Sequence, residues 1–125
     1  MRIRKEILER MAEEARRTPE QECCGLLAGR DGIISEIFPA GNALASATEF
    51  EIAPAELFRI FRAMREAGLE HLGIYHSHPR GPAAPSEKDI ERAYYPEAAY
   101  FVIWREIKAF GIRDGKVEEL KIKIV

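Results

Sequence analysis

Apolar residues in the first part of the chain recur at the spacing of an amphipathic helix. Ile3, Ile7 and Met11 fall on one stripe, and charged residues fill most of the positions between them. Because residues three and four apart share one face of a helix, this pattern predicts a helix over residues 2–17. Pro19 ends the helix, since the residue before a proline avoids the helical conformation.

Two further helices are expected from their apolar stripes and their boundary residues. Pro54 opens the first, at a position where the missing N–H costs nothing, and Gly68 closes it after a stripe that ends at Met64. The second helix covers residues 86–94 and stops before Pro96, which cannot continue it.

Short apolar runs bounded by turn residues predict the strands. Asp31-Gly32 marks a hairpin, and Asp114-Gly115 marks another tight connection. The predicted strands cover residues 23–28, 33–38, 50–52, 72–78, 98–105, 107–113 and 117–125. Helices interspersed with a mostly antiparallel or mixed sheet favour an α/β or α+β layered fold. No linker divides the chain, so residues 1–125 are expected to form a single domain.

The charge pattern and the hydropathy bear on the partners of the protein. Lysine and arginine total 19, aspartate and glutamate total 21, and the formal net charge is −2 with both signs interleaved. A nucleic-acid-binding domain carries a basic patch, so no nucleic-acid partner is expected. The apolar stretches are too short to span a bilayer, and residues 1–6 do not lead into the apolar core of a signal peptide. We therefore expect no membrane partner and a cytoplasmic location.

The two cysteines, Cys23 and Cys24, are adjacent, and the chain has no other. Neighbouring residues are poorly placed for a disulfide, which fits a reducing compartment. A zinc cluster made of thiolates needs CxxC pairs, so such a cluster is excluded within one chain. Cys23 follows Glu22 and is a minor alternative as a metal ligand.

The candidate chemistry lies in two of the three histidines. His76 and His78 are two positions apart on a predicted strand, so their side chains point to the same face and can converge on one metal ion. Asp89 is the candidate third ligand, because the loop at residues 79–85 would turn the next helix back toward this strand. Two histidines and one aspartate leave the fourth position of a tetrahedral zinc site for water, as in a catalytic site. His71 follows a helix end and is expected at the surface.

A simpler interpretation needs no metal. Ser86-Glu-Lys-Asp89 matches the pattern of a helix capping box, in which Ser86 caps the helix and Asp89 returns the hydrogen bond. A histidine on a strand is also commonly a satisfied polar residue. From the local pattern alone, both interpretations stay open.

The full run from His76 to Asp89 reads H-S-H-P followed by P-S-E-K-D, and it resembles the JAMM motif H-x-H-P…P-S-x-x-D of the catalytic MPN-domain metallopeptidases. The segment from Glu22 to Leu27, E-C-C-G-L-L, is similar to the E-x-C-G-x-L stretch of that family. The similarity extends over nearly the whole chain. It implies a cytidine-deaminase-like layered fold, with a mixed central sheet flanked by helices.

The resemblance also implies a role for each matching residue. His76, His78 and Asp89 would bind Zn²⁺, and Glu22 would be the general base that takes a proton from the attacking water and returns it to the leaving amine. Ser86 would donate a hydrogen bond to the oxyanion of the tetrahedral intermediate. The role of Glu22 rests on the resemblance alone, because spacing does not distinguish it from the other glutamates.

The resemblance is strongest to the stand-alone prokaryotic members of the family, and among them to the sulfur-carrier-protein–cysteine hydrolases. It implies a zinc peptidase or isopeptidase that cleaves at the C-terminal tail of a ubiquitin-like sulfur carrier protein. A non-catalytic MPN scaffold and a metal-binding interaction module are the alternatives. A nucleobase deaminase is disfavoured, because the chain has no P-C-x-x-C element. The oligomeric state stays open, a homodimer included.

Overall fold

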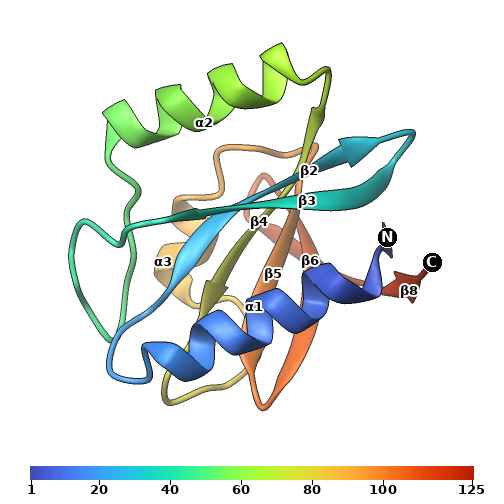
Figure 1. Cartoon of the computed structure of the whole chain (residues 1–125). Helices are drawn as coiled ribbons and strands as arrows, with labels where there is room; N and C mark the ends of the chain where they lie inside the picture. The colour runs from blue at the N-terminus through green and yellow to red at the C-terminus, as the bar shows by residue number, and fades with distance from the viewer.

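The computed structural model describes all 125 residues and contains one mixed sheet of eight strands and three helices (Figure 1). The helices are α1 (Lys5–Arg17), α2 (Pro54–Glu66) and α3 (Glu87–Glu91). The strands are β1 (Arg2–Ile3), β2 (Cys24–Arg30), β3 (Ile33–Ala40), β4 (Glu70–Ser77), β5 (Ala99–Trp104), β6 (Glu106–Arg113), β7 (Lys116–Leu120) and β8 (Lys123–Ile124). They lie in the order β7-β6-β5-β4-β2-β3-β1-β8. The layered α/β fold expected from the sequence is confirmed.

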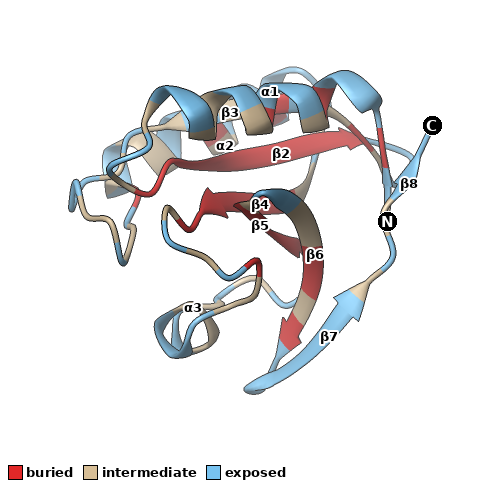
Figure 2. Ribbon diagram, turned by 90° about the horizontal axis from the view of Figure 1, so that it is seen from below, coloured by how far each residue is buried: buried red, intermediate tan, exposed pale blue.

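Alternating residues of the central strands face two separate apolar clusters. In β2, Leu27 belongs to the cluster that α1 covers, whereas Leu26 belongs to the cluster that α2 covers. In β5, Phe101 and Val102 divide in the same way. Because successive residues of a strand point to opposite faces, each helix buries its apolar stripe against one face of the sheet. Figure 2 shows buried residues concentrated in β2, β4 and β5, while β7 at the edge is exposed.

The strands β4 and β5 are the neighbours that pair in parallel at the centre of the sheet, whereas β2 pairs with β4 in the antiparallel sense. A parallel pair needs a crossover connection, and here the crossover contains α3. Open sheets commonly bind ligands outside the carboxyl ends of their strands. The loop and helix that follow β4 therefore lie at the end of the sheet where a functional site is expected.

The predicted strand at residues 50–52 is wrong. The chain between β3 and α2, residues 41–53, contains no strand. The N–H of Glu51 donates to Asn42 Oδ1 over 3.2 Å, and the Glu51 carbonyl accepts from the N–H of Ala43 over 2.8 Å. These local hydrogen bonds occupy the backbone groups that a strand ladder would use.

The two ends of the chain also differ from the prediction. Arg2–Ile3 form a strand that pairs in parallel with β3 and with β8, and the helix begins only at Lys5. The predicted final strand is divided into β7 and β8. Pairing between the two termini, which lie close together in Figure 1, is a long-range interaction that local periodicity does not report. The third helix ends at Glu91, three residues earlier than predicted.

His71 is half-buried rather than at the surface. Its Nε2 lies 3.0 Å from the carbonyl oxygen of Gly73, and its ring packs edge-on against Phe61 and Tyr95. His71 is not part of the group of possible metal-binding residues that contains His76 and His78. No helix in the structure combines the length and the apolar character that crossing a bilayer would need.

Candidate metal centre

His76 and His78 lie at the carboxyl end of β4, and their side chains turn to the same side. His76 is the last but one residue of the strand, and the N–H of His78 still donates to the Ile103 carbonyl of β5 over 2.9 Å. The extended backbone is thus maintained through both histidines. Their Nε2 atoms are 2.9 Å apart, and both rings are buried.

Asp89 completes this convergence from the first turn of α3. Its Oδ2 lies 3.0 Å from His76 Nε2 and 3.1 Å from His78 Nε2. The same oxygen accepts a hydrogen bond from the Ser86 N–H over 2.8 Å, and the Asp89 N–H donates to Ser86 Oγ over 3.2 Å. The capping box predicted as an alternative to a metal site is therefore present together with the three-residue cluster. One carboxylate oxygen has enough lone pairs both to accept the hydrogen bond of the capping box and to take part in the cluster with the histidines.

With both histidines neutral, hydrogen bonding does not satisfy all three converging atoms. The Nδ1 of His78 must donate to the Pro82 carbonyl, 2.8 Å away, because a carbonyl only accepts. Neutral His78 therefore presents a lone pair at Nε2, facing His76 Nε2 and Asp89 Oδ2. A cation bound by all three atoms resolves the conflict, and ligands around tetrahedral zinc are separated by a comparable distance, about 3.3 Å. The donor set fits a metal ion.

The electrostatics leave His76 and Asp89 in the protonation states that bind metals, whereas His78 takes up a proton more readily than an ordinary histidine. Burial lowers the pKa of His76, which keeps its ring neutral. Burial also opposes charge on His78, but hydrogen bonds to Asp89 and Pro82 outweigh it and raise the pKa of His78. Burial alone would raise the pKa of Asp89, yet hydrogen bonds from the two histidines hold it well below its usual range. An anionic carboxylate beside a neutral imidazole is what metal coordination requires.

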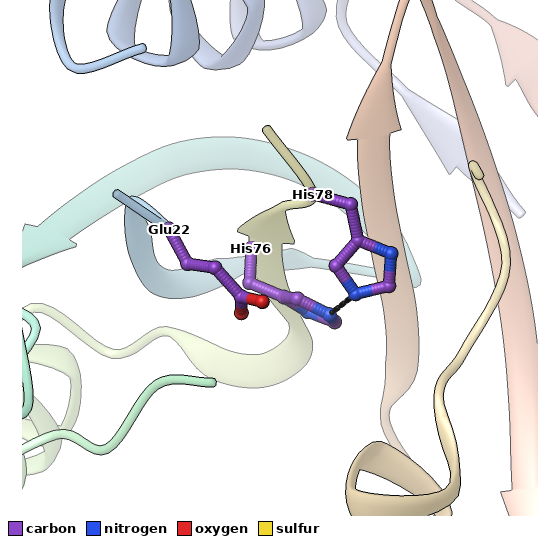
Figure 3. Close-up of side chains that lie close together, drawn as sticks. All are labelled: Glu22, His76 and His78. Carbon is purple, nitrogen blue, oxygen red and sulfur yellow. Dashed lines mark hydrogen bonds between the residues drawn. The ribbon is translucent and has the colours of Figure 1, made fainter. Parts of the chain in front are cut away.

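Glu22 lies beside the histidines without bonding to them (Figure 3). Its side chain enters from the segment before β2, it is 2 % exposed, and its Oε1 has no hydrogen-bond partner. One ligand atom each from Glu22, His76 and His78 lies within 4.8 Å of the others. Burial is the main cause that raises the pKa of Glu22 to about 8, while the charge of His78 opposes the rise. An unpaired buried carboxyl beside a cation site fits a proton-transfer group better than a structural residue.

Ser77, the residue between the two histidines, aligns Glu22 with them. The Ser77 N–H donates to the Cys23 carbonyl over 3.0 Å, and Ser77 Oγ accepts from the Cys23 N–H over 2.9 Å. This reciprocal pair fixes the beginning of β2 against the end of β4. Glu22, one residue earlier, is thereby placed on the same face as His76.

Ser86 is exposed and acts as the N-cap of α3. Its oxygen accepts the cap hydrogen bond, which leaves the hydroxyl hydrogen free to donate outward. Its backbone N–H donates a hydrogen bond to Asp89 Oδ2, the same oxygen that lies close to both histidines. The residue therefore adjoins the cluster, one hydrogen bond away.

A cavity of about 350 Å³ adjoins the cluster and is lined by His76 and Asp89. The ring of Phe50 forms part of its wall and stacks on the ring of His76, with 4.6 Å between centroids. Glu49, which also lines the cavity, pairs with Lys88 over 3.0 Å and with Arg92 over 3.2 Å, and both cations line it as well. Sequence reasoning missed Phe50, because an aromatic residue in a loop carries no local signal of a contact with a distant strand.

A second cavity, of about 430 Å³, is lined by residues of α1, of the β5–β6 connection and by His78. Neither His76 nor Asp89 lines it. The cavity that Phe50 borders is thus lined by two of the three converging residues, the second cavity by one, and neither by Glu22.

Comparison with known proteins gives an independent view of the chain. Residues 4–116 match the family described as prokaryotic homologues of the JAB domain. The CysO-cysteine peptidase of Mycobacterium tuberculosis is 33 % identical over 131 aligned positions, covering 98 % of this chain and 90 % of that protein. A probable TtuB-protein conjugate cleaving protease of Thermus thermophilus is 33 % identical over 112 positions, covering 88 % of this chain and 74 % of that protein.

Solved structures show the same architecture. A protein from Desulfitobacterium hafniense superposes with a TM-score of 0.89 at 33 % identity, covering 99 % of this chain and 92 % of that one. A JAB1/MPN domain protein from Archaeoglobus fulgidus shares the fold, with a TM-score of 0.70 at 21 % identity, covering 100 % of this chain and 99 % of that one. With the family match over most of its length, this chain belongs to the prokaryotic JAB-domain family.

Proposed function

We propose that this protein is a zinc-dependent peptidase that cleaves the bond after the C-terminal tail of a ubiquitin-like or sulfur carrier protein. The observation that carries the proposal is the convergence of His76 Nε2, His78 Nε2 and Asp89 Oδ2, with separations of 2.9–3.1 Å, beside the unpaired carboxyl of Glu22. In this proposal the first three residues hold the ion.

Zinc is the metal that we propose for this donor set. Imidazole and carboxylate ligands suit it, and three protein ligands leave one position open, as in catalytic zinc sites. A bound zinc ion supplies a Lewis acid that activates water and polarises the scissile carbonyl.

The chain's own residues would supply the proton transfers and the hydrogen bonds. Glu22 takes a proton from the attacking water and later donates it to the leaving amine, a task that favours a carboxyl of raised pKa in a buried position. The outward-facing hydroxyl of Ser86 donates to the developing oxyanion. His78 stays oriented through its Nδ1–H, which donates to the Pro82 carbonyl.

The substrate class is inferred from the relatives. One is named for a peptide bond between the carrier CysO and cysteine, and the other for cleavage of TtuB–protein conjugates. Both names describe a small carrier protein joined to a second group, which supports a carrier-protein substrate here. We further propose that residues 1–125 act as one domain in the cytoplasm, a setting that suits two free, buried thiols.

A non-catalytic scaffold is the competing function, and Glu22 argues against it. A scaffold gains nothing from a buried carboxyl with an unpartnered oxygen, which costs stability. A general base, in contrast, needs a free oxygen to receive a proton.

The test is hydrolysis of CysO carrying a C-terminal cysteine, followed by mass spectrometry after incubation with the zinc-loaded protein. We expect release of cysteine, and we expect Glu22→Gln to lower kcat by about 10²- to 10⁴-fold with the zinc content unchanged. Glu36→Gln, an exposed glutamate of β3, is the matched control and should keep full activity.

Two results would contradict the proposal. One is an intact carrier after prolonged incubation with the zinc-loaded protein, for CysO-cysteine and for a carrier–lysine conjugate alike. The other is equal turnover by the wild type and by the Glu22→Gln variant.

A further inference from the structure

The loop between β3 and α2 is organised around the only asparagine of the chain, Asn42. Its Oδ1 accepts hydrogen bonds from the N–H groups of Leu44 and Glu51, over 3.0 and 3.2 Å. The loop thus closes on itself, although its ends are nine residues apart in the sequence.

The amide nitrogen of the same side chain reaches out of the loop. Asn42 Nδ2 donates to the carbonyl of Glu22 over 3.1 Å and to the carbonyl of Glu49 over 3.0 Å. A longer contact of 3.4 Å joins it to the Ser46 carbonyl. Two amide hydrogens and one amide oxygen are therefore fully used, and one side chain links the loop to the residue proposed as the general base.

Neither of the two residue types most similar to asparagine fits these contacts. The oxygen of the amide faces two N–H donors and its nitrogen faces carbonyl oxygens, so the orientation of Asn42 is fixed by its partners. Aspartate would place an oxygen against those carbonyls, and glutamine would be one methylene too long.

Glu22 depends on this loop because it lies outside the sheet. β2 begins at Cys24, so no neighbouring strand bonds the backbone of Glu22. Its N–H donates to the Ser46 carbonyl over 2.8 Å, and its carbonyl accepts from Asn42. Both of its backbone groups are thus held by the loop, while the unpaired Oε1 leaves the carboxyl without a bond of its own.

We propose that Asn42 is a positioning residue that acts through the backbone of Glu22 to hold the carboxyl at the reaction centre. The inference rests on the proposed function, in which Glu22 is the general base. Asn42 does not touch the histidines or Asp89, so its contribution falls on proton transfer and not on metal binding.

The same loop contacts the cavity at its far end, which gives a second way in which Asn42 could act. Phe50 stacks on His76, and Glu49, whose carbonyl Asn42 also holds, pairs with Lys88, which lines the cavity as well. An effect through these residues would change substrate binding and raise KM. An effect through Glu22 would lower kcat at constant KM.

The experiment compares Asn42→Asp and Asn42→Ser with the wild type, using CysO-cysteine as the substrate and the zinc content as a parallel measurement. Aspartate keeps the two accepted bonds and loses the donated ones, while serine keeps one acceptor for the turn at Leu44 and serves as the second variant if aspartate unfolds the loop. Displacement of a catalytic group by about 1 Å can cost about 10²-fold, so we expect a 10- to 100-fold loss of kcat with KM and zinc content within twofold.

Thr48→Val is the matched control within the loop. It removes the 3.2 Å contact between Thr48 Oγ1 and Ser46 Oγ but leaves every bond of Asn42, so kcat should not change. A cycle with Glu22→Gln separates positioning from general loosening. Once the base is gone, replacing Asn42 should lower kcat no further.

Three outcomes would overturn the inference. They are an Asn42 variant that keeps the wild-type kcat, one that changes only KM, and one that slows the Glu22→Gln enzyme as much as it slows the wild type. If instead the wild type cleaves neither CysO-cysteine nor the carrier–lysine conjugate, or Glu22→Gln is fully active, the proposed function fails, and the two failures are distinguishable.

Discussion

Removal of the metal is expected to inactivate the protein without unfolding it. His76, His78 and Asp89 belong to neither of the two apolar clusters, which contain 12 and 11 buried residues. Neither these clusters nor the backbone pairing of the strands β6, β5, β4, β2 and β3 depends on a bound cation. The fold therefore retains its main source of stability, the burial of apolar surface, when the ligands lose their ion.

The size of the metal's contribution follows from binding linkage. At a free zinc concentration one hundred times Kd, binding adds about 2.7 kcal/mol to the free energy of unfolding. A chain of 125 residues has an unfolding entropy of about 0.26 kcal/mol/K. Chelation should therefore lower Tm by roughly 10 °C, from the quotient of these two values.

The local consequence should be confined to α3 and the loop before it. α3 has five residues, none of them buried, and it is held by its capping box and by the pairing of Glu49 with Lys88 and Arg92. Loss of the ion removes one of its few attachments. Amide hydrogen exchange should accelerate in α3 and stay slow in β2, β4 and β5, whose residues are mostly buried.

The assay is thermal unfolding followed by circular dichroism, with zinc and then with excess chelator. Asp89→Ala should lose the zinc-dependent shift in Tm, whereas Glu22→Gln, which changes no proposed ligand, should keep it. Loss of the sheet signal at 25 °C on chelation would refute the reasoning, because it would mean that the ion and not the two clusters maintains the fold.

The two remaining predictions concern a glycine and the thiols. Gly81→Ala should weaken zinc binding about 10- to 100-fold in a competition titration. A Cβ at this position would lie 2.3 Å from the Trp104 ring, and the resulting shift would displace the Pro82 carbonyl that orients His78. Unchanged affinity would show that this loop has no influence on the site. Burial raises the pKa of the Cys23 thiol to about 11, and that of Cys24 to about 12. Iodoacetamide at pH 8 should then react at least about 100-fold more slowly with the native protein than in urea, since the native thiols stay protonated until the pH approaches these values. Equal rates would contradict the assigned burial.

Much of the architecture could be predicted from local patterns. The stripe through Ile7 and Met11 indicated α1, and these residues are buried under it. The separation of His76 and His78 by two residues predicted that they share a face, because side chains of a strand alternate. The loop at residues 79–85 pointed to Asp89, because such a loop can turn the next helix back toward the end of β4.

Other features depend on contacts that periodicity does not encode. Residues 50–52 have the composition of a strand, yet Asn42 Oδ1 accepts from the Glu51 N–H, and the Ala43 N–H donates to the Glu51 carbonyl. The N-terminal strand exists only because β3 and β8 pair with it. Phe50 reaches His76 across a stretch of 26 residues, a contact that only the folded chain can create.

For the site itself, the sequence alone determined the types of the proposed ligands, their spacing and the family resemblance that selected Glu22. The tertiary structure decided how that glutamate meets the histidines: Ser77 fixes β2 against β4, and Asn42 holds the backbone of Glu22 from a loop twenty residues away. The reason is physical. The alternation of side chains in a strand and the residue preferences of turns act between near neighbours, so they are visible in the sequence. The carboxyl of Glu22, in contrast, lies beside a strand that is distant in the sequence, and long-range hydrogen bonds place it there. Those hydrogen bonds form only when the sheet has assembled.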